Sequence, residues 1–67
     1  MKIFVNDEAL EILDDTSLAS ALDSVGVEDA KGWAVAVNRE VVPFEDWEQT
    51  ELKPEDSLLL VRATQGG

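Results

Sequence analysis

Apolar and polar residues alternate near the start of the chain, and this alternation predicts a hairpin of two β-strands. The first strand covers residues 2–6, with Ile3 and Val5 on one face, and the second covers residues 9–13. The connection at residues 6–8 is Asn-Asp-Glu, and Asn and Asp tolerate the left-handed backbone of tight turns. The fold is therefore expected to begin with a tight hairpin.

The spacing of apolar residues then changes from that of a strand to that of a helix. Leu18, Leu22 and Val25 form one stripe, and Gly26 follows them. We place the N-cap at Thr16, because its hydroxyl oxygen can accept a hydrogen bond from a free backbone N–H of the first turn. We place the end of the helix at Gly26. A helix of about ten residues is not stable alone, so we expect it to pack against a sheet.

The second half of the chain contains three further runs rich in β-forming residues. Residues 33–37 and 41–42 predict two strands joined by an Asn-Arg-Glu turn, with a Pro ending the second. Residues 57–63 predict a last strand that is apolar on both faces. Residues 44–52 fit a short helical turn that carries Trp47 for packing, followed by a connecting segment.

This order of elements favours one architecture. A hydrophobic last strand that follows a crossover usually lies inside a sheet. If it lies beside the first strand, with one main helix across one face, the result is an α+β fold of the β-grasp (ubiquitin-like) type, with a mixed sheet of about five strands. We divide the chain into a β-grasp domain, residues 1–63, and a flexible C-terminal Gly-Gly tail, residues 64–67.

Alternation along the strands assigns each apolar residue to one face of this sheet. The residues expected under the helix are Ile3, Val5, Leu10, Ile12, Leu18, Leu22, Val25, Val35, Val37, Leu58 and Leu60. The residues expected on the opposite face are Phe4, Ala34, Ala36, Leu59 and Val61. No helix is left to cover that face, so it is a candidate interaction surface. The alternative is that residues 44–52 fold over part of it.

Composition narrows the chemistry that side chains can perform. Fifteen Asp and Glu residues against five Lys and Arg give a formal charge of -10, which argues against binding nucleic acid or anionic membranes. The chain has no Cys or His, which excludes disulfides, the usual zinc sites and histidine catalysis. We expect no metal site, because the acidic pairs at 14–15 and 45–46 lack the spaced ligands of a calcium loop. We expect the protein in the cytoplasm, since it has no leader or apolar run of about 20 residues.

The end of the chain offers a different kind of candidate. Two of the four glycines are Gly66 and Gly67, directly after the last predicted strand. One interpretation is a frayed terminus. The other is that the Gly67 carboxylate is itself the reacting group, because residues without a Cβ can pass through a narrow channel to a nucleotide.

Four features of the chain form a distinctive set: MKIFVN at residues 1–6, AVAVNREVVP at residues 34–43, Trp47, and Gly66-Gly67. In these features the chain resembles the ThiS family of small ubiquitin-like sulfur carriers in thiamine thiazole biosynthesis. Phe44 departs from the family pattern, because a basic residue commonly follows that Pro. The related MoaD carriers of molybdopterin synthesis share the fold and the tail but are less similar in the second of these features.

The resemblance implies a protein co-substrate that is not an enzyme and binds no cofactor itself. A ThiF-like enzyme would adenylate the Gly67 carboxylate with ATP and magnesium, and Gly66 would give the tail flexibility and access. A cysteine desulfurase or another persulfide donor would then convert the adenylate to a thiocarboxylate, whose sulfur passes to the thiazole synthase ThiG. Residues implied in docking these partners are Phe4, Leu59, Val61 and Ala63.

Three alternatives remain open at this point. The chain could be a MoaD-like carrier for molybdopterin or another sulfur pathway. It could be a ubiquitin-like modifier that is conjugated to other proteins through Gly67. It could also be a non-covalent adaptor with an inert tail.

Overall fold

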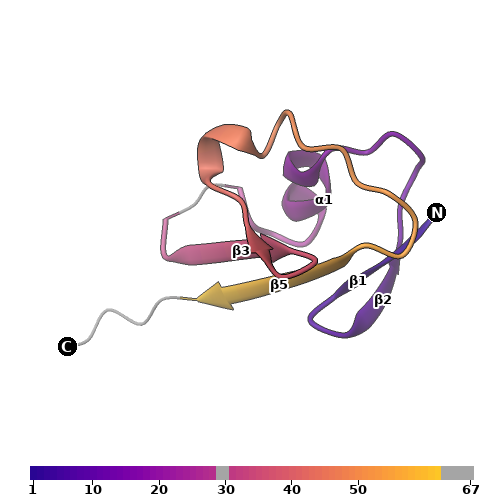
Figure 1. Cartoon of the computed structure of the whole chain (residues 1–67), viewed down its shortest axis with the longest axis horizontal. Helices are drawn as coiled ribbons and strands as arrows, with labels where there is room; N and C mark the ends of the chain where they lie inside the picture. The colour runs from indigo at the N-terminus through magenta and orange to yellow at the C-terminus, as the bar shows by residue number, and fades with distance from the viewer. Residues whose placement is uncertain (29–30, 63–67) are drawn as a thin grey trace.

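The computed structural model describes residues 1–28 and 31–62. Its elements in chain order are β1 (Lys2–Val5), β2 (Glu8–Glu11), α1 (Leu18–Ser24), β3 (Trp33–Val37), β4 (Glu40–Val41), the 3₁₀ turn η1 (Phe44–Asp46) and β5 (Ser57–Arg62). Five strands form one sheet and α1 packs across one face of it (Figure 1). This arrangement confirms the predicted α+β architecture. No helix in the described part of the chain is long and apolar enough to cross a membrane.

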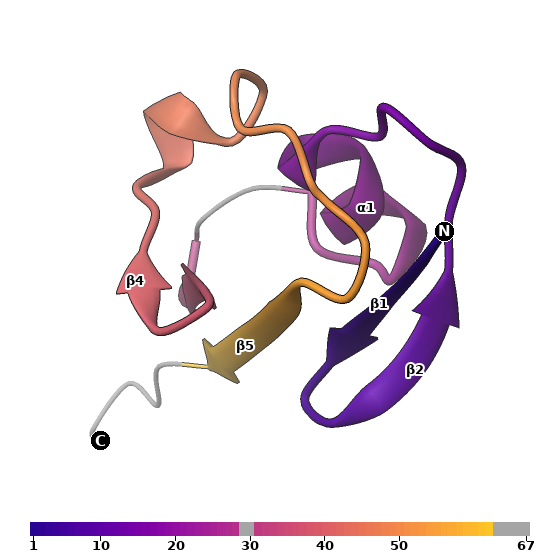
Figure 2. The same cartoon turned by 45° about the vertical axis from the view of Figure 1, so that its right-hand side comes forward.

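Strand β5 lies at the centre of the sheet, whose order is β2-β1-β5-β3-β4. It runs parallel to β1, which pairs antiparallel with β2 (Figure 2). On its other side β5 runs antiparallel to β3, which pairs antiparallel with β4. The last strand is therefore interior to the sheet and beside the first, as the sequence predicts. Its described end is Arg62, so Ala63 lies outside the described residues.

The two hairpins turn through pairs of residues with positive φ. Asn6 and Asp7 have φ of 50° and 71°, and Asn38 and Arg39 have φ of 51° and 73°. Two-residue turns with both φ values positive are the type I′ turns that match the twist of paired strands. The turn chemistry predicted at both places is thus confirmed.

The helix begins one residue later than the sequence predicts. Its N-cap is Ser17, whose hydroxyl oxygen accepts a hydrogen bond from the Ser20 N–H at 3.1 Å. The Thr16 hydroxyl instead donates to the Leu13 carbonyl at 2.5 Å, so the prediction of Thr16 as the cap is wrong. The end is confirmed, since Gly26 has φ of 90°. Val25 is the C-cap and is 40% exposed, so its predicted place in the core is also wrong.

The segment after β4 completes the start of this helix. The first N–H groups of α1 have no partner within the helix. Leu18 N–H donates to the Thr50 carbonyl at 2.7 Å, and Ala19 N–H donates to the Trp47 carbonyl at 3.0 Å. In Figures 1 and 2 this segment lies on the same side of the sheet as α1. It therefore does not cover the opposite face, and that alternative is wrong.

The core lies between α1, the sheet and this capping segment. Its buried residues are Ile3, Leu18, Ala21, Leu22, Val27, Val35, Trp47, Leu52 and Leu58. Burial of Ile3, Leu22 and Leu58 confirms the predicted inward face. The periodic pattern does not predict Val27 and Leu52, because each lies in a connection between elements. Val27 N–H donates to the Leu22 carbonyl at 2.8 Å, and Leu52 N–H donates to the Thr16 carbonyl at 3.1 Å, so both connections are held close to the ends of α1.

Three strands are shorter or shifted relative to the prediction. Strand β1 ends at Val5 instead of residue 6, because Asn6 is already the first residue of the turn. Strand β2 ends at Glu11, and Leu13 is almost fully exposed because the chain has already left the sheet toward α1. Strand β4 is Glu40–Val41 instead of residues 41–42, because the type I′ turn occupies two residues.

The positive φ of Arg39 provides a test of the turn assignment. An L-residue other than Asn, Asp or Gly is disfavoured in this conformation, whereas Gly adopts it readily. We expect Arg39→Gly to raise the free energy of unfolding in urea by about 0.5–1 kcal/mol. Arg39→Ala is the control, because it removes the same charge but keeps the Cβ. Equal stability of the two variants would contradict the assignment.

Candidate functional site

The face of the sheet away from α1 is an open apolar surface, and we call it the outer face. Phe4 of β1 lies beside β5, where Leu59 and Val61 point to the same side. The β3 partners of these two residues are Ala36 for Leu59 and Ala34 for Val61. Leu59 is 54% exposed and Val61 is 51% exposed. The structure therefore brings together all the predicted outer-face residues on one surface.

The structure adds Val41 to the outer face. Val41 pairs with Ala36 across the β3–β4 hairpin and is 71% exposed. Residues paired directly across two strands lie on the same face. Sequence reasoning missed Val41 because a two-residue strand has no alternation of its own. The length of the turn was the available signal, since it fixes the register of Val41.

Charged residues lie at the edge of the outer face. The Lys2 ammonium lies 5.4 Å from the centre of the Phe4 ring, and Lys2 pairs with Glu11 of β2. A cation above an aromatic ring is attracted to the ring face. The outer face thus has an apolar centre on β5 and β3 and a polar margin at the β1–β2 edge.

The described end of β5 carries a second contact between a cation and an aromatic ring. The Arg62 guanidinium lies 5.5 Å from the centre of the Trp33 ring. Trp33 alternates with Ala34, so it lies on the α1 side of the sheet and packs against the core. Trp33 therefore has a packing role in the structure. The structure also places an Arg at the point where β5 leads toward residues 63–67.

Phe44, the departure from the family pattern, packs on a buried aromatic residue. Its ring meets Trp47 edge to face, with the ring centroids 5.1 Å apart. The Trp47 indole N–H donates to the Val42 carbonyl at 2.9 Å. Phe44 itself is half exposed on η1, on the α1 side of the sheet. It therefore takes no part in the outer face.

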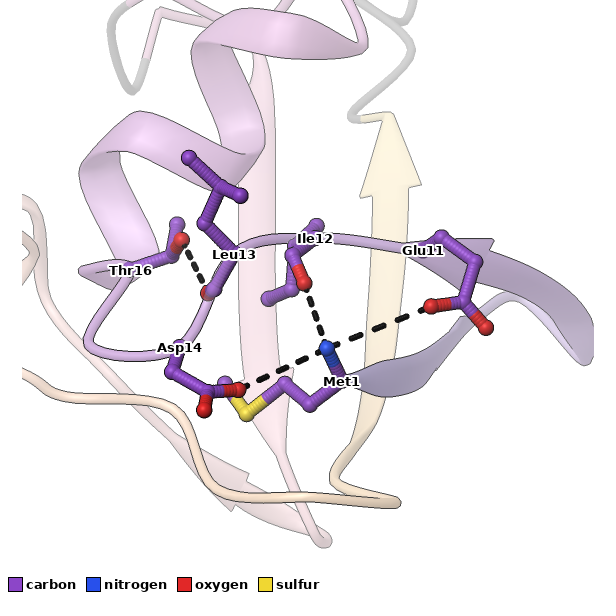
Figure 3. A network of polar contacts seen from close by, with 6 residues as sticks. All are labelled: Met1, Glu11, Ile12, Leu13, Asp14 and Thr16. Atoms are coloured by element: carbon purple, nitrogen blue, oxygen red, sulfur yellow. Dashed lines mark hydrogen bonds and ion pairs between the residues drawn. The ribbon is translucent and has the colours of Figure 1, made fainter.

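Asp14, the first residue of the acidic pair at residues 14–15, lies near the N-terminal amine of the chain. The Met1 amine donates to the Ile12 carbonyl at 2.6 Å and lies 3.5 Å from the Asp14 carboxylate and 3.9 Å from that of Glu11 (Figure 3). Both acidic residues of the pair precede the helix cap and lie outside the first turn of α1. Within residues 1–28 and 31–62, no three His, Cys, Asp or Glu residues are placed to hold a metal ion.

The predicted reacting residues, Gly66 and Gly67, lie outside the described residues, as does the predicted docking residue Ala63. Their roles stay predictions. The structure does place the strand from which this segment continues, because β5 is central in the sheet and carries Leu59 and Val61 close to its described end.

Comparison with known proteins identifies the family to which this chain belongs. The model of the ThiS family matches residues 2–67. The chain belongs to the ThiS family. Over 67 residues it is 31% identical to the sulfur carrier protein ThiS of Escherichia coli (strain K12), and the match covers 100% of both chains. The resemblance inferred from the sequence is thereby confirmed.

Solved structures related to the ThiS family share the fold of this chain. A crystal structure of the thiamine biosynthesis protein ThiS from Geobacter metallireducens matches with a TM-score of 0.84 and 23% identity, covering 100% of both chains. A solution structure of a thiamine biosynthesis protein from the same organism matches with a TM-score of 0.77 and 23% identity, covering 100% of this chain and 88% of the other. These likenesses confirm the β-grasp fold.

Two valines on the inner strands test the assignment of the two faces. Val35 is buried under α1 and Val61 is half exposed on the outer face. We expect Val35→Ala to lower the free energy of unfolding by about 2 kcal/mol, because it removes buried methyl groups and leaves a cavity. The matched change Val61→Ala should cost less than about 1 kcal/mol. Urea denaturation of both variants gives the comparison, and similar losses would mean that the outer face is covered.

Proposed function

We propose that this chain carries sulfur on the carboxylate of Gly67 and delivers it for thiazole formation in thiamine biosynthesis. The supporting observation is the match to the E. coli sulfur carrier ThiS, which covers 100% of both chains and so includes Gly66-Gly67. The chain's own chemistry agrees with this function. It has no Cys or His, so a terminal carboxylate is a reacting group that needs no catalytic side chain from the carrier.

The first step makes that carboxylate reactive. A carboxylate is a poor electrophile because its negative charge repels nucleophiles. In a ThiF-like adenylating enzyme, a Gly67 oxygen attacks the α-phosphorus of ATP and pyrophosphate leaves, which forms an acyl-adenylate. ATP and magnesium belong to that enzyme, since magnesium is held largely by substrate phosphates.

The second step exchanges AMP for sulfur. The terminal sulfur of a cysteine desulfurase persulfide, or of another persulfide donor, attacks the acyl carbon and displaces AMP. A thiol then reduces the resulting acyl disulfide, which leaves a thiocarboxylate on Gly67 and a disulfide on the donor side. The thiocarboxylate is a good sulfur nucleophile, and the thiazole synthase ThiG is its acceptor. In both steps the carrier is a co-substrate and its partners supply the catalysis.

The outer face is the surface on which these partners would dock. Leu59 and Val61 are half exposed on the strand that leads to the tail, and Phe4 and Val41 extend the apolar area to either side. Exposed apolar residues that cluster at the centre of a surface are typical of binding hot spots. The charge of -10 would speed the encounter with a basic partner surface. Ala63 follows Arg62 in the sequence and stays a proposed contact.

Intact-mass measurement tests the proposed reaction directly. We expect the chain, incubated with a ThiF-like enzyme, ATP, magnesium and a persulfide donor, to gain the mass difference between one sulfur and one oxygen. A variant lacking Gly67 should fold equally well and show no change. Higher-mass conjugates with other proteins would indicate a protein modifier, and an unchanged mass would indicate a non-covalent adaptor. Transfer of the sulfur to molybdopterin synthesis but not to ThiG would indicate a MoaD-like carrier.

The outer face can be tested with one apolar residue on each side of the fold. We expect Leu59→Ser to raise the KM of the chain in pyrophosphate release by the ThiF-like enzyme about tenfold, because it removes a central apolar contact. Leu13→Ser is the control, since Leu13 is also exposed but lies in the connection to α1. An equal KM for the two variants would rule out docking through Leu59.

A further inference from the structure

Strand β1 ends before its neighbour β5 does. The β1–β5 ladder has two residue pairs, Phe4 with Ser57 and Val5 with Leu58, whereas β5 continues to Arg62. Along the β1 side, the backbone groups of Leu60 therefore have no strand residue opposite them. Unpaired backbone groups beside a sheet need another partner, or they bond to water and the strand end frays.

The side chain of Asn6 fills this position. Its Oδ1 accepts a hydrogen bond from Leu60 N–H at 2.8 Å, and its Nδ2 donates to the Leu60 carbonyl at 3.3 Å. A primary amide carries the same donor and acceptor as a peptide group, so it pairs with both backbone groups of one residue. The backbone N–H of Asn6 also donates to the Leu58 carbonyl at 2.9 Å. The side chain of Asn6 thus continues the hydrogen-bond ladder between β1 and β5 as far as Leu60.

Leu60 lies between the two outer-face residues of β5. Leu59 and Val61 point away from the core, and Leu60 packs toward it. The Asn6 bonds fix the backbone of Leu60, and through it the direction of both exposed neighbours. They also fix the course of the strand two residues before Arg62, its described end.

We propose that Asn6 is a positioning residue for the reaction at the chain end. It holds the last residues of β5, so that the outer face and Arg62 meet a partner in one fixed orientation. This inference rests on the proposed function. A loosened β5 end would still fold, but each encounter would have to order it before the tail could enter an active site.

The second hairpin supplies a matched control in Asn38. Asn38 has the same place in its type I′ turn, with φ of 51° against 50° for Asn6. Its Oδ1 accepts from Ser57 N–H at 3.0 Å and its Nδ2 donates to the Asp56 carboxylate at 2.9 Å. These bonds hold the beginning of β5, the end far from the tail.

The test compares Asn6→Gly with Asn38→Gly. Gly tolerates the positive φ of both turns, so each variant loses the amide while keeping the turn. We expect Asn6→Gly to raise the exchange rate of the Leu60 amide at least about tenfold, measured by NMR hydrogen exchange. We also expect it to raise the KM of the chain for a ThiF-like enzyme about fivefold, with kcat unchanged, by pyrophosphate release.

Asn38→Gly should leave the Leu60 exchange rate and the KM within about twofold of the original chain. Equal effects of the two variants on KM, or an unchanged Leu60 exchange rate in Asn6→Gly, would overturn the role of Asn6. If the original chain releases no pyrophosphate with the enzyme, the proposed function fails and this role fails with it. If the original chain reacts and the two variants match, the role of Asn6 alone is overturned.

Discussion

The structure depends on strand β5, which lies at the centre of the sheet and has the core on one side and the exposed outer face on the other. Strand β5 pairs with β1 on one edge and with β3 on the other, so its backbone joins the two halves of the chain. Leu58 on one side of it is fully buried, while Leu59 on the other side is half exposed. Folding requires the first of these leucines but gains little from the second. The exposed residues of β5 are therefore better explained by binding than by stability.

The capping of the first turn of α1 leaves the outer face of the sheet open. The carbonyl groups of Trp47 and Thr50 accept hydrogen bonds from the first N–H groups of the helix. Trp47 is also buried in the core. The segment after β4 is thus committed to the helix side of the sheet. Within residues 1–28 and 31–62, every helical element lies on that side, so the apolar outer face follows from how the helix is capped.

Much of this arrangement could be predicted from local sequence, and the failures have physical causes. The hairpins were predictable because Asn at a turn tolerates positive φ. The cap was misplaced because Thr16 and Ser17 are adjacent hydroxyl residues, and the backbone path decides which one faces the helix. Leu52 was missed because it follows no period. The bonds of Asn6 to β5 depend on where β1 stops relative to its neighbour, which no local pattern contains.

The outer face has a shape that follows from the residues of its two inner strands. Leu59 and Val61 rise from β5, while the residues opposite them on β3 are Ala36 and Ala34. Because leucine and valine side chains are larger than those of alanine, the exposed residues of β5 form a ridge beside their β3 neighbours, and this ridge follows the strand that ends at Arg62. A partner with a groove that fits this ridge would be aligned with the axis of β5 when it binds. Shape complementarity would then orient β5 on such a partner, in addition to the Asn6 bonds that hold the end of the strand.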